Sequence, residues 1–111
     1  MIGLSKEDQL KRHAPLKEKP LKDKAFLSWM HSQGFGCIVC GNPQIELHHV
    51  KEHSSEVKND HEVLPLCEFH HKYSDYISPH GSPKKWREVY PIEFQKQMAK
   101  VYYERYLDET N

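Results

Sequence analysis

The chain has 111 residues, of which 29 % are charged and 37 % hydrophobic, and its formal net charge is zero. This length corresponds to one domain, whose small core commonly needs help from a metal or from disulfides. The balanced charge argues against a protein that coats nucleic acid through general basicity. The lack of an 18-residue apolar run argues against a membrane span, and the N-terminus lacks the apolar stretch of a signal peptide, so we expect a cytoplasmic protein.

Charge is distributed unevenly along the sequence. Basic residues outnumber acidic ones in residues 5–24 and 84–100, and acidic residues outnumber basic ones in residues 41–76. The three cysteines and most of the nine histidines also lie in the centre. Basic flanks around a histidine-rich centre suit a site that holds cations and meets a polyanion, although ordinary solvated faces would give the same pattern.

Residues 1–20 predict a basic arm that is rich in lysine and interrupted by Pro15 and Pro20. Ser5 and Asp8 match a capping box for a short helix over Ser5 to Arg12, and a disordered tail is the alternative. Residues 21–111 are expected to form a single domain, with a core over residues 37–90.

A helical pattern follows Pro20, because Phe26, Trp29 and Met30 recur at helical spacing and Gly34 supplies a C-terminal stop. Trp29 and Met30 are expected to pack this helix on the metal centre described below.

Two short strands and a helix are expected in the centre of the chain. Residues 45–50 alternate between apolar and polar and predict one strand, and Val63 to Leu66 predicts a second. A helix is expected over residues 68–77, and the fold class is therefore α+β.

The C-terminal third predicts one or two helical turns over residues 84–90 and a last helix over residues 92–107. The apolar side of this last helix is expected to face the core. It consists of Phe94, Met98, Val101, Tyr102 and Tyr106.

The first constellation of metal-ligand residues is Cys37-x2-Cys40, followed after 26 residues by Cys67-x2-His70. Zinc takes four nitrogen or sulfur ligands, and a two-residue gap lets one turn present two of them. The pattern predicts a structural zinc site, because four protein ligands leave no open position. The alternative is three free buried cysteines.

The second constellation uses the remaining central histidines. His48 and His49 end the first strand, whereas His71 and Asp75 are four residues apart on the expected helix and would project from one face. His80 follows in a turn. Such an arrangement suits a hydrolytic metal site with open positions, and an unligated histidine beside it can accept a proton near neutral pH. A lone histidine is more often a surface residue, which is the reading for His13, His31 and His53.

In these motifs the sequence resembles the HNH, or ββα-metal, nuclease family over residues 37–90. This family implies a small zinc-stabilised, treble-clef-like core, here with flanking N- and C-terminal helices. The resemblance rests on Cys37-x2-Cys40, Leu47-His48-His49-Val50, Leu64-Pro65-Leu66-Cys67 and His70-His71. Lys17 to Pro20, Trp29, His80-Gly81 and Trp86 also resemble phage recombination-enhancement nucleases that act with RecA.

The resemblance implies a role for each histidine of the second constellation. His48 and His71 would bind the catalytic metal, and His49 would be the general base. Asp75 and His80 compete as the remaining ligand, and His80 fits the narrower family better. The metal would be Mg²⁺ or Mn²⁺, with Ni²⁺ or Zn²⁺ also acceptable to histidine ligands.

One position departs from the family. Its middle Asn usually lies five residues before the second-strand Cys, where this chain has Glu62. Asn59 and His61 are nearby but out of register. In the family this Asn orients the general base or fixes the loop, so Glu62 or His61 substitutes for it or the support is missing.

The sequence therefore predicts a metal-dependent DNA endonuclease that hydrolyses phosphodiester bonds, with a RecA filament as an expected partner in phage recombination. The alternatives are a zinc module that binds DNA or protein without cutting, and an assembly factor on a recombination filament. Residues expected to hold the flanking phosphates, unless they are plain surface charge, are Lys72, Lys84, Lys85 and Arg87.

Overall fold

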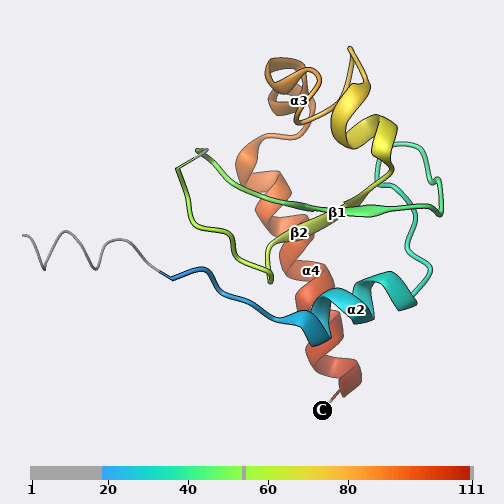
Figure 1. The fold of residues 1–111 in the computed structure, drawn as a ribbon, viewed down its shortest axis with the longest axis vertical. Coiled ribbons are helices and arrows are strands. Elements are labelled where there is room, and N and C mark those ends of the chain that lie inside the picture. The colour runs from blue at the N-terminus through green and yellow to red at the C-terminus, as the bar shows by residue number, and fades with distance from the viewer. Residues whose placement is uncertain (1–18, 54, 111) are drawn as a thin grey trace, which may run out of the picture.

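The computed structural model describes residues 19–53 and 55–110. In chain order the elements are α2 (Lys24–Ser32), β1 (Glu46–His49), β2 (Val63–Leu66), a single π-helical turn η2 (Phe69–Tyr73), α3 (Pro83–Val89) and α4 (Ile92–Thr110) (Figure 1). The expected α+β class is confirmed. The expected arm, apart from Lys19 and Pro20, lies outside the described residues, as does the expected helix over Ser5 to Arg12. Across the described ranges no helix is long and apolar enough to cross a membrane.

The two strands form one antiparallel sheet, which α4 crosses behind in the view of Figure 1. Glu46 pairs with Leu66 and His48 pairs with Leu64. Every residue of β2 is buried, whereas those of β1 are half-buried. The apolar strand is therefore the centre of the core, and β1 carries polar side chains at its edge.

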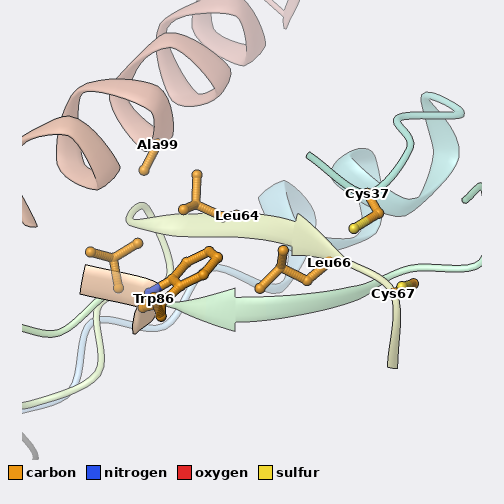
Figure 2. Close-up of a cluster of buried hydrophobic side chains, with 7 residues drawn as sticks. Cys37, Leu64, Leu66, Cys67, Trp86 and Ala99 are labelled. Atoms are coloured by element: carbon orange, nitrogen blue, oxygen red, sulfur yellow. The ribbon is translucent and has the colours of Figure 1, made fainter. Parts of the chain in front are cut away.

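The core has two clusters of buried side chains, and the larger one joins the sheet to α3 and α4. In Figure 2, Leu64 points toward Ala99 of α4, and Cys37 and Cys67 lie at the end of the cluster away from α4. The full set of buried residues in this cluster is Cys37, Val50, Leu64, Leu66, Cys67, Trp86 and Ala99.

The smaller cluster places α2 against α4. Phe26 and Met30 are fully buried together with Val63 of β2, and Trp29 packs beside them with its ring 5.3 Å from that of Tyr106. The expectation that Trp29 and Met30 pack α2 on the metal centre is therefore wrong. Aromatic rings of α4 pack against α2 instead, and the cysteines belong to the other core cluster.

The apolar side expected for α4 is only partly correct. Phe94 and Val101 are 47 % and 63 % exposed, whereas Gln95 and Ala99 are buried. The small Ala99 side chain lets the helix approach the sheet, and the Gln95 amide donates to the Tyr90 carbonyl at 2.6 Å, so its burial is compensated. Packing has thus rotated the helix away from the face with the most apolar residues.

The helix expected over residues 68–77 is shorter than predicted and ends after Tyr73. Ser74 is extended (φ −62°, ψ 130°), and its hydroxyl accepts hydrogen bonds from the backbone amides of Tyr76 and Ile77. Serine side chains often compete with the backbone in this way and favour turns over helix. Asp75 therefore lies in a turn and not on a helical face with His71.

Candidate functional site

The structure brings Cys37, Cys40, Cys67 and His70 together as one cluster, with one ligand atom from each residue within 4.8 Å of the others. The Cys40 and Cys67 sulfurs are 3.7 Å apart, and His70 Nδ1 lies 3.3 Å from the Cys67 sulfur. Sulfur ligands around a tetrahedral zinc would be roughly 3.7 Å apart for bonds of about 2.3 Å. This Cys₃His cluster could hold a metal ion such as zinc.

A tight turn presents the first two cysteines. The Val39 amide lies 3.4 Å from the Cys37 sulfur, and Gly41 has a left-handed backbone (φ +80°) that a side chain would strain. The three cysteines are free thiols. Burial raises the pKa of Cys37, but backbone amides of the turn and of Cys67 outweigh it and lower the pKa overall, which favours the thiolate that a metal requires.

A second cluster consists of His48, His71 and His80, with one ring nitrogen from each within 4.8 Å of the others. The three rings come from β1, from η2 and from the loop after η2, and their centroids are 4.8 to 5.7 Å apart. Donors from three separate segments converge here, as expected for a site that fixes a ligand's position. Imidazole nitrogens suit Ni²⁺ and Zn²⁺.

A serine-rich loop over residues 74–82 delivers His80. The His80 amide donates to the His71 carbonyl at 3.2 Å, and the Ser82 hydroxyl donates to the Ser74 carbonyl at 3.0 Å. Gly81 is essential to this return, because a Cβ there would lie 2.8 Å from two carbonyl oxygens of the preceding turn. Of the two residues that compete as third ligand, the structure brings His80 to the pair, whereas Asp75 is exposed outside the cluster.

Glu46 supports the second cluster and was not foreseen from the sequence. Its carboxylate lies 2.7 Å from Nδ1 of His71, which leaves Nε2 of that ring for a ligand. Carboxylates behind a ligating histidine fix its tautomer and its orientation. The sequence did carry a signal, because Glu46 and His48 are two apart on a strand and therefore share a face.

His49 has a carboxylate partner that the sequence did not indicate. Its Nε2 lies 2.7 Å from an oxygen of Asp60, whose other oxygen accepts the Asp23 amide at 2.8 Å. Burial raises the pKa of Asp60, but these hydrogen bonds outweigh it and lower the pKa, so the carboxylate is ionised. Of the two suggested substitutes for the missing Asn, Glu62 lies 3.3 Å from the Asn59 amide and His61 bonds to Asp23.

One pocket of about 450 Å³ joins His49 to the histidine cluster. Among the described residues, none that lines it is Asp or Glu, although the chain has 16 acidic residues. Five histidines and three cations do line it, which makes the pocket suited to an anion. These residues are His48, His49, Lys51, His53, Lys58, His71, His80 and Arg87.

Of the four predicted phosphate-binding residues, Arg87 alone lines this pocket. Arg87 also donates to the Glu52 carbonyl at 3.3 Å and so ties α3 to the loop between the strands. Lys72 pairs with Glu46 at 3.4 Å, and Lys85 lies over the Tyr76 ring. Lys84 is exposed.

Electrostatics keep His48 neutral. Burial, reinforced by the repulsion that a proton on the neighbouring His71 or His80 ring would exert, lowers the pKa of His48 to about 3. Burial also lowers the pKa of His80, and the charges of His71 and Lys72 contribute. Neutral imidazole is the form that binds a metal, so these rings carry free lone pairs near neutral pH.

No protein-family model, curated protein or solved structure matches the chain. Membership of the HNH family therefore stays a prediction based on the sequence motifs. A proposed function has to explain the two clusters and the pocket, which no carboxylate among the described residues lines.

Proposed function

We propose that the chain is a metal-dependent DNA endonuclease of the HNH type, with a separate structural zinc. The observation that carries this proposal is the pocket in which three convergent histidines, a histidine paired with Asp60, and three cations occur without a lining carboxylate. A phosphodiester is an anion whose hydrolysis needs a base and stabilisation of developing negative charge. The pocket offers residues for each of these tasks.

His48, His71 and His80 would hold the catalytic metal. Three nitrogen donors leave open coordination positions, which distinguishes a catalytic ion from a structural one. When bound, the ion would stabilise the charge that develops on the phosphate and on the leaving oxygen. The nitrogen donors favour Ni²⁺ or Zn²⁺ over Mg²⁺ and Mn²⁺, which prefer oxygen ligands, and a histidine site would accept Mn²⁺ as well.

His49 is the proposed general base. With Nε2 donating to Asp60, Nδ1 carries the free lone pair and takes a proton from the attacking water. Asp60 is a positioning residue, because its carboxylate orients the ring and stabilises the imidazolium that forms. It thereby takes the place of the family's middle Asn from a different position in the loop.

Lys51, Lys58 and Arg87 are proposed to neutralise the phosphates that enter the pocket. Lys51 and Lys58 belong to the loop between the strands, and Arg87 belongs to α3. Cations on two sides of the histidines would align the phosphodiester with His49. Affinity for DNA should therefore fall as salt concentration rises.

The structural zinc is assigned to the Cys₃His cluster. All four ligands come from the protein, and Cys37 and Cys67 are buried in the larger core cluster. Zinc there would link the Cys37–Cys40 turn to the end of β2 and to η2. In this assignment β1, β2 and η2 correspond to the ββα unit of the HNH family.

The proposal is tested by plasmid nicking with purified zinc-loaded protein and added Mg²⁺ or Mn²⁺, with and without a RecA–DNA filament. His49→Ala should lose activity by a factor of about 10²–10⁴. His31→Ala is the matched control, because His31 is exposed on α2, and it should cut like the wild type.

Cutting by the wild type and by His31→Ala, together with its loss in His49→Ala, would support the endonuclease and its base. A requirement for the filament would support the recombination role. No cutting under any condition, by protein that retains its zinc, would contradict the proposal and leave a zinc-containing binding module.

A further inference from the structure

Residues 69–76, which include and follow the last residue of the Cys₃His cluster, expose large aromatic side chains. Phe69, Tyr73 and Tyr76 are 56 %, 61 % and 76 % exposed to solvent, counting the described residues. None of them belongs to either core cluster, so the fold gains little from them. Large apolar groups that gather at one surface usually mark a binding site.

A cation lies over one of these rings. The Lys85 ammonium lies 5.1 Å from the centroid of the Tyr76 ring, and it also donates to the Asp75 carbonyl at 3.2 Å. Lys72 and Lys84 are also exposed and lie nearby in the sequence. The same segment carries two carboxylates, those of Glu68 and Asp75. Aromatic faces interleaved with cations are the arrangement by which proteins bind single-stranded nucleic acid: the rings stack on bases and the cations hold the backbone.

One loop carries both Tyr76 and His80 of the histidine pocket. Tyr76 lies in the loop over residues 74–82, which hydroxyl hydrogen bonds of Ser74, Ser78 and Ser82 hold in shape. The same loop ends at His80, whose amide bonds to His71. A base on Tyr76 would therefore be held by the same loop that carries His80 of the pocket.

We propose that Tyr73 and Tyr76 stack on unpaired bases, so that the substrate is single-stranded or locally unpaired DNA. This inference rests on the proposed function, and it specifies the substrate class. A base inside a duplex has no free face, because its neighbours stack on both sides. Lys72, Lys84 and Lys85, which lie outside the pocket lining, would then contact the backbone of the stacked strand.

Fluorescence anisotropy with labelled oligo-dT and with a hairpin duplex tests the inference on the full-length chain carrying His49→Ala, which prevents cutting. Adding Tyr76→Leu removes the ring but keeps an apolar side chain, and it should weaken oligo-dT binding about tenfold. Tyr76→Phe keeps the ring and should bind within about twofold of the parent, since stacking needs the aromatic face. Tyr73→Leu and Tyr73→Phe should behave in the same way.

Phe94→Leu is the matched control, because Phe94 is exposed to 47 % on α4, and it should leave oligo-dT binding unchanged. Equal losses for oligo-dT and for the duplex, or no loss with either leucine variant, would overturn the inference. Oligo-dT binding that depends on the tyrosines, in a protein that never cuts DNA, would refute the proposed nuclease while it supports this platform.

Discussion

The two histidine-containing clusters take neighbouring residues of η2, His70 and His71, but they differ in how they are built. His70 faces three cysteines, two of which are buried in the core, and every ligand position is supplied by the chain. His71 faces two other histidines in a pocket of about 450 Å³ and is supported from behind by Glu46. One cluster is closed and part of the core, whereas the other is open and backed by carboxylates.

This difference separates stability from chemistry. Removal of a ligand from the closed cluster should remove a cross-link between three segments of the core. Removal of a residue from the open cluster should change what the pocket binds or does, and leave the core intact. Four predictions test this division, in order of decreasing effect.

Cys67→Ser should be the most damaging change. It removes a buried ligand at the end of β2, and we expect a loss of at least about 5 kcal/mol of unfolding free energy because structural zinc supplies much of the stability of small domains. His71→Ala should retain both zinc and a cooperative thermal transition. Thermal melting followed by circular dichroism, with zinc content measured by mass spectrometry, checks both expectations. Equal melting of the two variants would contradict the division between the closed and the open cluster.

Asp60→Asn should reduce cutting about a hundredfold, since His49 loses the charge that orients it and stabilises its protonated form. Zinc content and DNA affinity should not change. The effect should vanish in a His49→Ala background, which single-turnover assays of the double variant measure. Additive losses in that background would show that Asp60 acts on something other than His49.

Glu46→Gln should weaken metal binding in the open cluster 10- to 100-fold, because a carboxylate behind a ligating histidine strengthens it as a donor. Calorimetric titration with Mn²⁺ or Zn²⁺ into protein whose Cys₃His cluster is already loaded gives the affinity. Lys72→Ala, which removes the other partner of Glu46, is the control and should change the affinity little. A similar loss in both variants would point to surface charge as the cause.

Asp23→Asn should have the smallest effect. The hydrogen bond from His61, followed by that from the Phe26 amide, lowers the pKa of Asp23 in the folded protein. This carboxylate therefore stabilises the fold above its ordinary pKa of about 3.8, and the stabilisation is lost as pH falls through the lower pKa of the folded state. At pH 7 the wild type should exceed the variant by about 0.5–1 kcal/mol. Chemical denaturation at several pH values should show this gap closing below about pH 4.

Local pattern predicted much of this molecule from the sequence. The Cys₃His cluster could be predicted because a gap of two residues lets a single turn present two ligands. Its members are Cys37, Cys40, Cys67 and His70. The strands and the last two helices also appeared close to their expected positions, since alternation and helical spacing are local. Pro83 and Pro91 marked where the last two helices begin.

What the sequence could not supply depends on contacts between distant residues. Asp60 meets His49 because a loop with no periodic pattern folds back, and a parallel bridge between Leu21 and Asn59 helps to hold it. His80 reaches His71 because Ser74 ends a helix that the apolar pattern would have continued. The rotation of α4 likewise follows from the small side chain of Ala99.

The adjacency of His70 and His71 on the single turn η2 couples the two clusters through the backbone. His70 binds toward the cysteines and His71 toward the pocket, so whatever fixes one residue fixes the backbone of the other. A chain made where zinc is scarce would lack the support that positions His71, and its pocket would remain unformed even with other metals in excess. With zinc in the Cys₃His cluster, as proposed, the supply of zinc during synthesis would decide whether the pocket forms.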